Sequence, residues 1–131
     1  LEGPLAAEAA SAPKMATFAY EPLCRGLLTG RRNATDRFPD TDLRARDDRF
    51  VGKRYLRALT LTSRLALIAA RHAVPTSALA VAWVLRQPAV DVALVGAKRP
   101  AQVLENVVAG SLTLDDDVWR EVDRIAGAWH G

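Results

Sequence analysis

The sequence VDVALVGAKRPAQVLEN, residues 90–106, passes from an apolar run through a basic turn into the start of a helix. Residues 90–95 are apolar apart from one aspartate, which is typical of a short buried strand in a parallel sheet. A turn follows at 96–99, and Pro100 suits the first position of a helix over 100–109. Because ligands bind where parallel strands lead into helices, this unit predicts an α/β fold with a functional turn.

Further strands and helices are predicted on both sides of this unit. Residues 15–20 form a second apolar run of strand length, and they follow the end of a helix expected over 4–12. Apolar spacing predicts helices over 61–73 and 76–87 between the strands, and over 114–128 after them. Two parallel strands cannot close a barrel, so this order predicts the end of a larger α/β fold.

Residue types that start or stop helices set the expected boundaries. Thr60 is expected to cap the helix that follows it, and Gly110 to end the helix that starts at Pro100. Thr113 and Asp116 resemble the capping box that would begin the last helix.

Basic charge is concentrated in one part of the chain. The 131 residues are 50% hydrophobic and 25% charged, an ordinary composition for a small globular domain, with a net charge of +3. Residues 31–57 contain eight Arg and one Lys against five Asp, a net +4, so the rest of the chain sums to −1. We interpret 31–57 as a long Arg-rich loop that either serves an anionic ligand or is simply solvated. The alternation of Arg with Asp, without an aromatic platform, argues against nucleic-acid binding.

Signals for export or membrane insertion are missing from the sequence. Cys24 is the only cysteine, so no disulfide can form within the chain. No apolar run reaches the roughly 18 residues of a membrane helix, and the first residues lack the order of a signal peptide. We therefore expect a cytoplasmic protein with no membrane contact. The chain opens at Leu1 rather than Met, which we interpret as the loss of upstream residues.

Two strand-to-helix turns carry the candidate chemistry, over residues 20–30 and 96–106. In the second turn, Lys98 and Arg99 stand just before a helix N-terminus. Backbone N–H groups, the helix dipole and two cationic side chains would converge there on an anion such as a phosphate. The alternative is a solvated basic turn with a proline start, and these residues alone leave both interpretations open.

Four motifs, in order, resemble the aldo-keto reductase family. The first turn, YEPLCRGLLTG, is similar to the family's Y-S-P-L-x-x-G-L-L-T-G, and the second, GAKRPAQVLEN, to its G-A-[KR]-[KR]-P-x-Q-[VL]-x-E-N. Between them, Asp48-Arg49-Phe50 and the helix segment 80–85 resemble two further family segments. The similarity spans residues 5–128. It implies that 1–131 is a single partial domain, the C-terminal part of a TIM (β/α)8 barrel.

The resemblance implies NADP(H) as cofactor and a small carbonyl or alcohol as substrate. Tyr20 would stack on the nicotinamide ring, and the backbone and side chains of Leu23, Arg25 and Gly26 would line the pyrophosphate. Lys98 and Arg99 would hold the 2′-phosphate, with the adenosine beside the following helix. The positions that correspond to cofactor contacts are Tyr20, Leu23, Arg25, Gly26, Lys98, Arg99, Gln102 and Asn106.

Two positions depart from the family pattern. Glu21 replaces the usual serine and puts a carboxylate near the expected anionic cofactor. It could pair with Arg25 or another arginine, or it could weaken NADPH binding. Arg31 replaces the usual lysine and keeps the charge.

The family's catalytic Asp, Tyr, Lys and His come from strands that precede this segment. The resemblance therefore implies no catalytic residue in this chain, and we expect the chain alone to be inactive as a reductase. The sequence also contains no cluster of metal ligands.

Two functional hypotheses remain. The chain is either part of an NADP-dependent oxidoreductase whose N-terminal barrel is its missing partner, or a naturally truncated relative. A truncated relative would have a non-redox role, such as binding a ligand or partner or catalysing a non-reductive biosynthetic step. It would self-associate, because the edges of a two-stranded sheet need covering.

Overall fold

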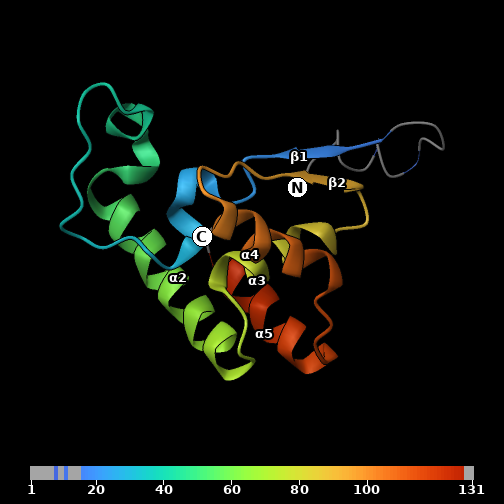
Figure 1. The fold of residues 1–131 in the computed structure, drawn as a ribbon. Coiled ribbons are helices and arrows are strands. Elements are labelled where there is room, and N and C mark those ends of the chain that lie inside the picture. Colours follow the sequence, from blue (N-terminus) through green and yellow to red (C-terminus); the bar gives the residue numbers. More distant parts are fainter. Residues whose placement is uncertain (1–7, 9–10, 12–15, 129–131) are drawn as a thin grey trace.

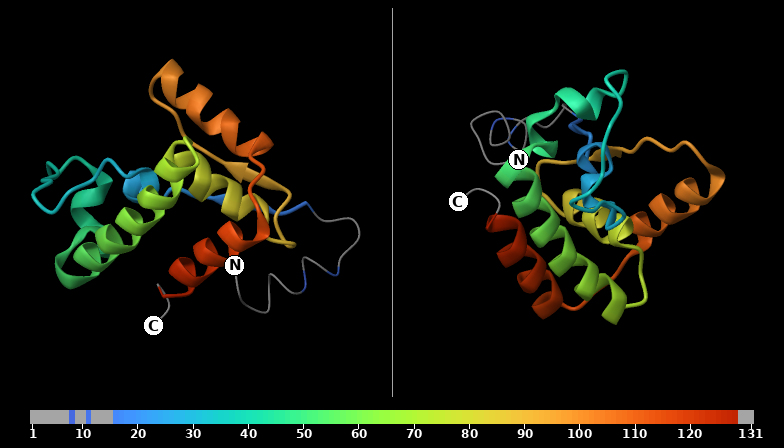
Figure 2. Two further views of the ribbon diagram at one scale, coloured as in Figure 1. Left: turned by 90° about the horizontal axis from the view of Figure 1, so that it is seen from below. Right: turned by 90° about the vertical axis from the view of Figure 1, so that its left-hand side faces the viewer.

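The computed structural model describes Glu8, Ser11 and residues 16–128 (Figure 1 and Figure 2). The expected helix over 4–12 therefore lies outside the described residues, apart from Glu8 and Ser11. In chain order the elements are β1 (Phe18–Tyr20), the 3₁₀ segments η1 (Cys24–Thr29), η2 (Leu43–Arg46) and η3 (Asp48–Phe50), α2 (Gly52–Arg71), α3 (Thr76–Leu85), β2 (Val92–Leu94), α4 (Pro100–Ser111) and α5 (Asp116–Gly127). The alternation of strand and helix confirms the predicted α/β class.

The two strands form one parallel sheet, with Phe18 opposite Val92. Both were predicted correctly in type, but both are shorter than the expected ranges 15–20 and 90–95. Figure 1 shows α3, α4 and α5 on one side of this sheet.

Local hydrogen bonds at one end and a backbone turn at the other limit the length of the two strands. The Asp91 carboxylate accepts a hydrogen bond from the Thr17 N–H at 2.8 Å. The N–H groups of Asp91 and Val92 both donate to the Thr17 carbonyl, at 3.0 and 3.1 Å, which fixes the start of the pairing. After Tyr20, the left-handed φ of 51° at Glu21 turns the chain out of the sheet.

Helix α3 lies at the centre of the hydrophobic core, where it contacts α2, α4, η1 and β2. Residues 77–82 are each at most 5% exposed, which confirms the prediction of a helix buried nearly all round. Figure 2 shows α2 and α5 side by side, and they supply Ile68 and Trp119 to the same core. The Arg86 guanidinium covers the outer face of the Trp119 ring, 4.5 Å from its centroid.

Helix α2 begins at Gly52, well before the expected range 61–73. Thr60 is inside the helix and does not cap it, because its hydroxyl donates to the carbonyl one turn earlier at 3.0 Å. Packing explains the early start. Tyr55 and Ala58 are buried and continue, at helical spacing, the apolar stripe that the prediction began further along.

The remaining helix boundaries differ by a few residues. The predicted ranges 76–87, 100–109 and 114–128 become Thr76–Leu85, Pro100–Ser111 and Asp116–Gly127. Pro100 starts its helix as predicted, but Gly110 does not end it, because the backbone there continues in the helix. The capping box of Thr113 and Asp116 is also wrong, since Asp115 is the N-cap and no side chain caps the helix.

Residues 31–57 do not form one loop, which corrects the prediction. Residues 31–50, called here the Arg-rich segment, contain η2 and η3 and pack against the start of α2. Phe38 and Tyr55 flank Phe50, with ring centroids 5.3 and 5.6 Å from it. The Tyr55 hydroxyl donates to the carbonyl of Asn33 at 2.9 Å. This small aromatic cluster gives the segment a defined shape.

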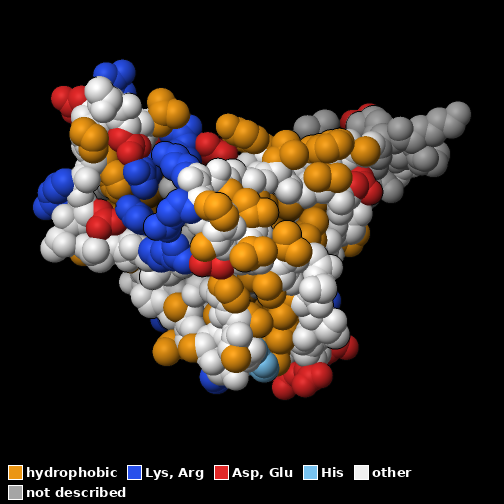
Figure 3. All heavy atoms as spheres, in the orientation of Figure 1, with side chains coloured by type: hydrophobic (Ala, Val, Ile, Leu, Met, Phe, Trp, Pro, Cys, Tyr) orange, Lys and Arg blue, Asp and Glu red, His pale blue; other side chains and the backbone are white. Residues whose placement is uncertain are grey.

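Apolar surface remains along the sheet and on α4, where Figure 3 shows hydrophobic side chains gathered. Phe18, Leu94 and Val107 are 55%, 46% and 66% exposed. Within the described part of the chain, no single helix is long and apolar enough to cross a membrane. Helices α2 and α3 would meet that test only together, and they are bent by 98° at the break between them.

Candidate functional site

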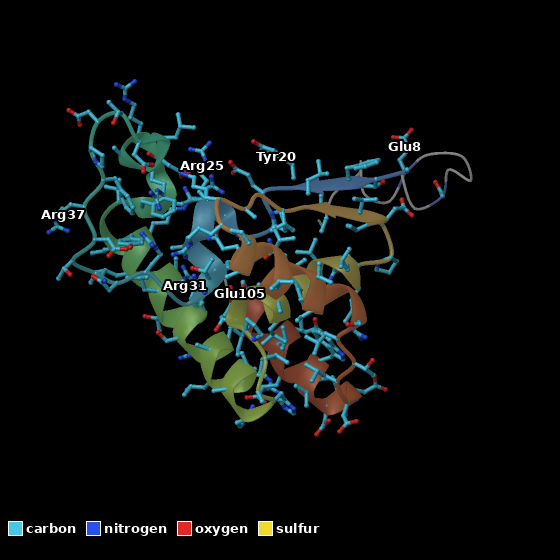
Figure 4. The ribbon with its side chains drawn as sticks, viewed as in Figure 1. Glu8, Tyr20, Arg25, Arg31, Arg37 and Glu105 are labelled. Carbon is cyan, nitrogen blue, oxygen red and sulfur yellow. The ribbon has the colours of Figure 1, made fainter. Side chains whose placement is uncertain are left out.

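The turns that follow β1 and β2 lie at the same edge of the sheet, because neighbouring parallel strands end on the same side. Arg31, just after the first turn, donates from Nη2 to the Glu105 carboxylate on α4 at 2.5 Å. Figure 4 shows Arg31 beside Glu105, with Arg25 further along this edge. One ion pair therefore joins the end of the first turn to the helix that follows the second.

The first turn has an unusual backbone. Glu21, Cys24 and Arg25 have φ values of 51°, 48° and 56°, in the left-handed region that favours glycine. Such conformations cost on the order of 1–3 kcal/mol each and cluster at ligand sites. Within the turn, the Cys24 N–H donates to the Glu21 carbonyl at 2.8 Å and the Gly26 N–H to the Leu23 carbonyl at 3.0 Å. These amides are engaged in holding the turn itself.

The side chains of the first turn pair with the Arg-rich segment. The Glu21 carboxylate accepts from Arg25 Nε at 2.9 Å and from Arg49 Nη2 at 3.0 Å. Asp47 Oδ2 lies 3.3 Å from Arg25 Nη1 and 2.6 Å from Arg49 Nη2. Glu21 therefore pairs with two arginines, where the sequence suggested one.

These contacts shift the pKa values of the acidic groups. Hydrogen bonds from Arg25, and then from Arg49, hold the pKa of the Glu21 carboxyl below its ordinary value of 4.5. The Arg49 guanidinium likewise lowers the pKa of Asp47. Both carboxyls are therefore ionised at neutral pH, and the first turn holds fixed negative charge beside its arginines.

Cys24 lies in the same turn without the features of a nucleophile. Burial raises the pKa of its thiol, although the nearby Arg49 acts in the opposite direction. The Cys24 side chain packs against the buried cluster that contains Leu27 and Phe50, and a raised pKa disfavours the reactive thiolate form.

The second turn is held by Gln102. Its side-chain Oε1 accepts from the Lys98 N–H at 2.8 Å and from the Arg99 N–H at 3.1 Å. Pro100 has no N–H, so the backbone donors at the start of α4 are largely used. The Lys98 and Arg99 side chains are exposed and form no ion pair with any described residue.

The Arg-rich segment borders both turns. Arg25 donates to the carbonyl of Leu43 at 3.4 Å. Beyond it, Asp42 accepts from Arg44 at 2.9 Å, and Arg44, with a smaller effect from Lys98, holds the pKa of Asp42 far below its ordinary range. Figure 3 shows Lys and Arg side chains gathered in the hollow between this segment and the rest of the molecule.

The other predicted positions are more dispersed. Tyr20 is 79% exposed on β1, whereas Leu23 packs against the core. Asn106 lines a shallow groove of about 290 Å³ between α3, β2 and α4, among apolar side chains. Arg25, Lys98 and Arg99 therefore belong to turns at one edge of the sheet, called here the basic edge, whereas Asn106 lies in an apolar setting.

Three residues of this edge were not predicted from sequence: Asp47, Arg49 and Glu105. Arg49 and Glu105 lie inside the family-like motifs, which mark these positions but do not predict the ion pairs that they form. Asp47 had no signal beyond its place in a charged loop.

Other candidate chemistry receives no support among the described residues. No group of three or more His, Cys, Asp or Glu side chains there could hold a metal ion. Tyr55 is fixed by its hydrogen bond to Asn33, and burial raises the pKa of its phenol. His72 lies at the C-cap of α2, away from both turns.

Comparison with known proteins gives a consistent family assignment. The model of the Aldo/keto reductase family matches residues 6–126. The aldo-keto reductase YhdN of Bacillus subtilis is 37% identical over 106 residues, which cover 79% of this chain and 32% of that protein. The NADP(+) aldo-keto reductase yakc of Schizosaccharomyces pombe is 31% identical over 103 residues, covering 79% and 30%.

A solved structure shows the same arrangement of elements. The glycerol dehydrogenase from Gluconobacter oxydans superposes with a TM-score of 0.76 at 35% identity, over 86% of this chain and 34% of that one. The two strands and their helices thus match part of a TIM barrel, and the chain spans about a third of the length of these relatives. The yakc protein is named for NADP(+), and another relative, from Escherichia coli, is an NADH-specific methylglyoxal reductase that is 34% identical over 97 residues. The match over nearly its whole length places this chain in the aldo/keto reductase family.

Proposed function

We propose that this chain is the C-terminal part of an NADP(H)-dependent oxidoreductase that interconverts carbonyls and alcohols, and that it supplies the cofactor-binding region. The observation that carries the proposal is the pair of exposed cations, Lys98 and Arg99, before the N-terminus of α4. Cationic side chains at a helix N-terminus suit a phosphate. A 2′-phosphate is the group that distinguishes NADP from NAD.

The second turn fits an anionic cofactor better than the first turn does. At the second turn, the two cations are free of described carboxylates, although Gln102 occupies their backbone N–H groups. The groups left to bind an anion there are therefore the charged side chains of Lys98 and Arg99, which suit the 2′-phosphate. At the first turn, Arg25 already pairs with Glu21 and Asp47, so a pyrophosphate would compete with these carboxylates.

Each part of the chain has a limited task in this proposal. The nicotinamide supplies the hydride when the cofactor is bound. Tyr20, exposed at the end of β1, offers a flat ring against which the nicotinamide can stack. The ion pair of Arg31 and Glu105 ties the two turns together and so holds the distance between their binding groups. The proton donor of the reaction comes from another part of the protein.

The partner of this chain, in the proposal, is the remaining part of the barrel. The sheet has two strands, and the apolar side chains along it and on α4 are exposed. The relatives are about three times as long and match this chain over only one part. The additional barrel strands would cover this apolar surface.

The proposal predicts that the double variant Lys98→Ala/Arg99→Ala loses affinity for NADPH much more than for NADH. The loss of charge-assisted contacts costs on the order of 1.5–3 kcal/mol, and NADH lacks the phosphate that these contacts would hold. Fluorescence titration of the full-length protein with both cofactors measures the effect. Equal weakening of both would contradict the assignment of Lys98 and Arg99 to the 2′-phosphate.

The second candidate is a naturally truncated relative with a non-redox role, and the exposed apolar surface favours it. In that case the surface is covered by a second copy of the chain. Sedimentation of the purified protein, together with the upstream reading frame, separates the two. An upstream Asp-Tyr-Lys-His set in a monomer supports the reductase. A stop codon immediately upstream, together with an obligate oligomer, supports the truncated form.

A further inference from the structure

Four charged side chains at the first turn form a closed network in which every charge is matched. Glu21 and Arg25 belong to the turn, whereas Asp47 and Arg49 come from the Arg-rich segment. Each carboxylate contacts both guanidinium groups, at distances from 2.6 to 3.3 Å. Two positive and two negative groups leave this network without net charge.

The second turn has the opposite character. Lys98 and Arg99 are exposed and pair with no carboxylate among the residues that the structure describes. Lys98 adds a small contribution to lowering the pKa of Asp42, but that carboxylate is already held by Arg44. At the second turn, the positive charge is therefore available to a ligand. At the first turn, the arginines are already neutralised by carboxylates of the same chain.

Glu21 is the accessible acidic member of the network. Its side chain is 23% exposed, against 9% for Asp47, and it follows β1 directly at the sheet edge. Both of its carboxylate oxygens are used by the arginines. An anion that reaches the first turn must therefore displace Glu21 from the guanidinium groups or lie against a carboxylate.

We propose that Glu21 lowers the affinity of the first turn for the diphosphate of a dinucleotide, and that the choice between NADPH and NADH is left to Lys98 and Arg99. This inference rests on the proposed function and deepens it. NADH, whose phosphate groups are confined to the diphosphate, depends on the end of the site that Glu21 neutralises. NADPH also carries the 2′-phosphate and can use the second turn.

The variant Glu21→Gln tests this role because it keeps the shape of the side chain and removes its charge. Arg25 and Arg49 remain paired with Asp47, so both guanidinium groups stay in place while the network gains one positive charge. We expect NADPH, NADH and inorganic pyrophosphate to bind more tightly, each by on the order of tenfold. The ratio of NADPH to NADH affinity stays unchanged, since all three ligands share the diphosphate.

Two further variants make the measurement interpretable. Glu121→Gln is the matched control, because Glu121 also pairs with an arginine, Arg71, but on α5 far along the chain from both turns. It is expected to bind all three ligands as the wild type does. Glu21→Ser also removes the carboxylate, with a shorter side chain, and serves if the Gln variant is not folded by circular dichroism. Calorimetric titration of the full-length protein gives each affinity.

The outcomes separate this inference from the proposed function. Tighter binding of pyrophosphate by both Glu21 variants, with no change in Glu121→Gln, supports the role of Glu21. This holds even if no protein binds NADPH, in which case the proposed function alone is wrong. Unchanged or weaker pyrophosphate binding in both Glu21 variants overturns the role of Glu21. The proposed function then stands as long as the wild type binds NADPH.

Discussion

At Gly30 the first turn lies close to the start of helix α3. The φ of Gly30 is +74°, and a Cβ built there would lie 3.0 Å from Oγ1 of Thr76. Substitution by alanine thus adds both a left-handed backbone penalty and a steric conflict.

We predict that Gly30→Ala lowers the free energy of unfolding by about 1–3 kcal/mol. The control is Gly110→Ala, inside α4, where an added Cβ meets nothing within 4 Å. Gly110 lies in the last turn of α4, where alanine still favours the helix over glycine, so this control should gain up to about 0.5–1 kcal/mol. Urea unfolding measures both. A loss in the Gly110 variant, or none in the Gly30 variant, would contradict the local geometry.

The carboxyls of the first turn predict an acid-dependent stability. The pKa of Glu21 lies below its ordinary value of 4.5 in the folded chain, chiefly because of Arg25 and then Arg49. A depressed pKa stabilises the fold above about the unfolded value, and that contribution is lost as the pH falls through the folded value. Thermal unfolding between neutral pH and pH 3 should therefore show a smaller acid loss in Glu21→Gln. An identical acid response would show that the pairs add nothing to stability.

For individual residues, the sequence indicates which side chains could bind a ligand, whereas their hydrogen-bond and ion-pair partners are visible only in the structure. Lys98 and Arg99 could be singled out because a helix start follows them directly. Glu21 was noticed only as a departure from a motif, and its second arginine could not be foreseen. Arg49 is distant in sequence, and only the fold of the Arg-rich segment brings it to the turn. Gln102 was expected near the adenosine, but its Oε1 binds the backbone of its own turn.

Among the elements, helix α3 was the easiest to predict and the start of α2 the hardest. The continuous apolar run 78–85, bounded by Pro75 and Pro88, strongly favours a short buried helix. By contrast, residues 52–60 are rich in charge, and their helical periodicity rests on Tyr55 and Ala58. Burial of these two against Leu27 and Phe50 is a tertiary contact, which the local pattern does not contain.

The strands were found, but not their length. Apolar runs mark where a strand can form, whereas the ladder extends only as far as a partner is present. Here Thr17 and Asp91 close one end and the turn at Glu21 closes the other. The length of each strand is therefore set by its pairing with the other strand, which neither apolar run shows by itself.

At the scale of the whole molecule, the apolar groove beside β2 and α4 predicts where a covering partner lies. Val107 lines this groove and is 66% exposed, and Leu67 on α2 is 68% exposed outside it. If further barrel strands cover the groove, Val107→Asp buries a charge in the full-length protein and lowers its melting temperature by several degrees. Leu67→Asp should change it little. Equal melting temperatures for the two variants would place the partner elsewhere.

Parallel pairing of β1 with β2 brings together residues separated by the whole of 21–91. Closing so long a stretch of chain is entropically unfavourable, and it becomes favourable only once α2 and α3 have shortened the distance. The two turns are therefore brought together only when the sheet forms. A ligand that contacts both of them is a cross-link between distant parts of the chain. Its binding would therefore raise the free energy of unfolding of the entire fold, rather than order a single loop.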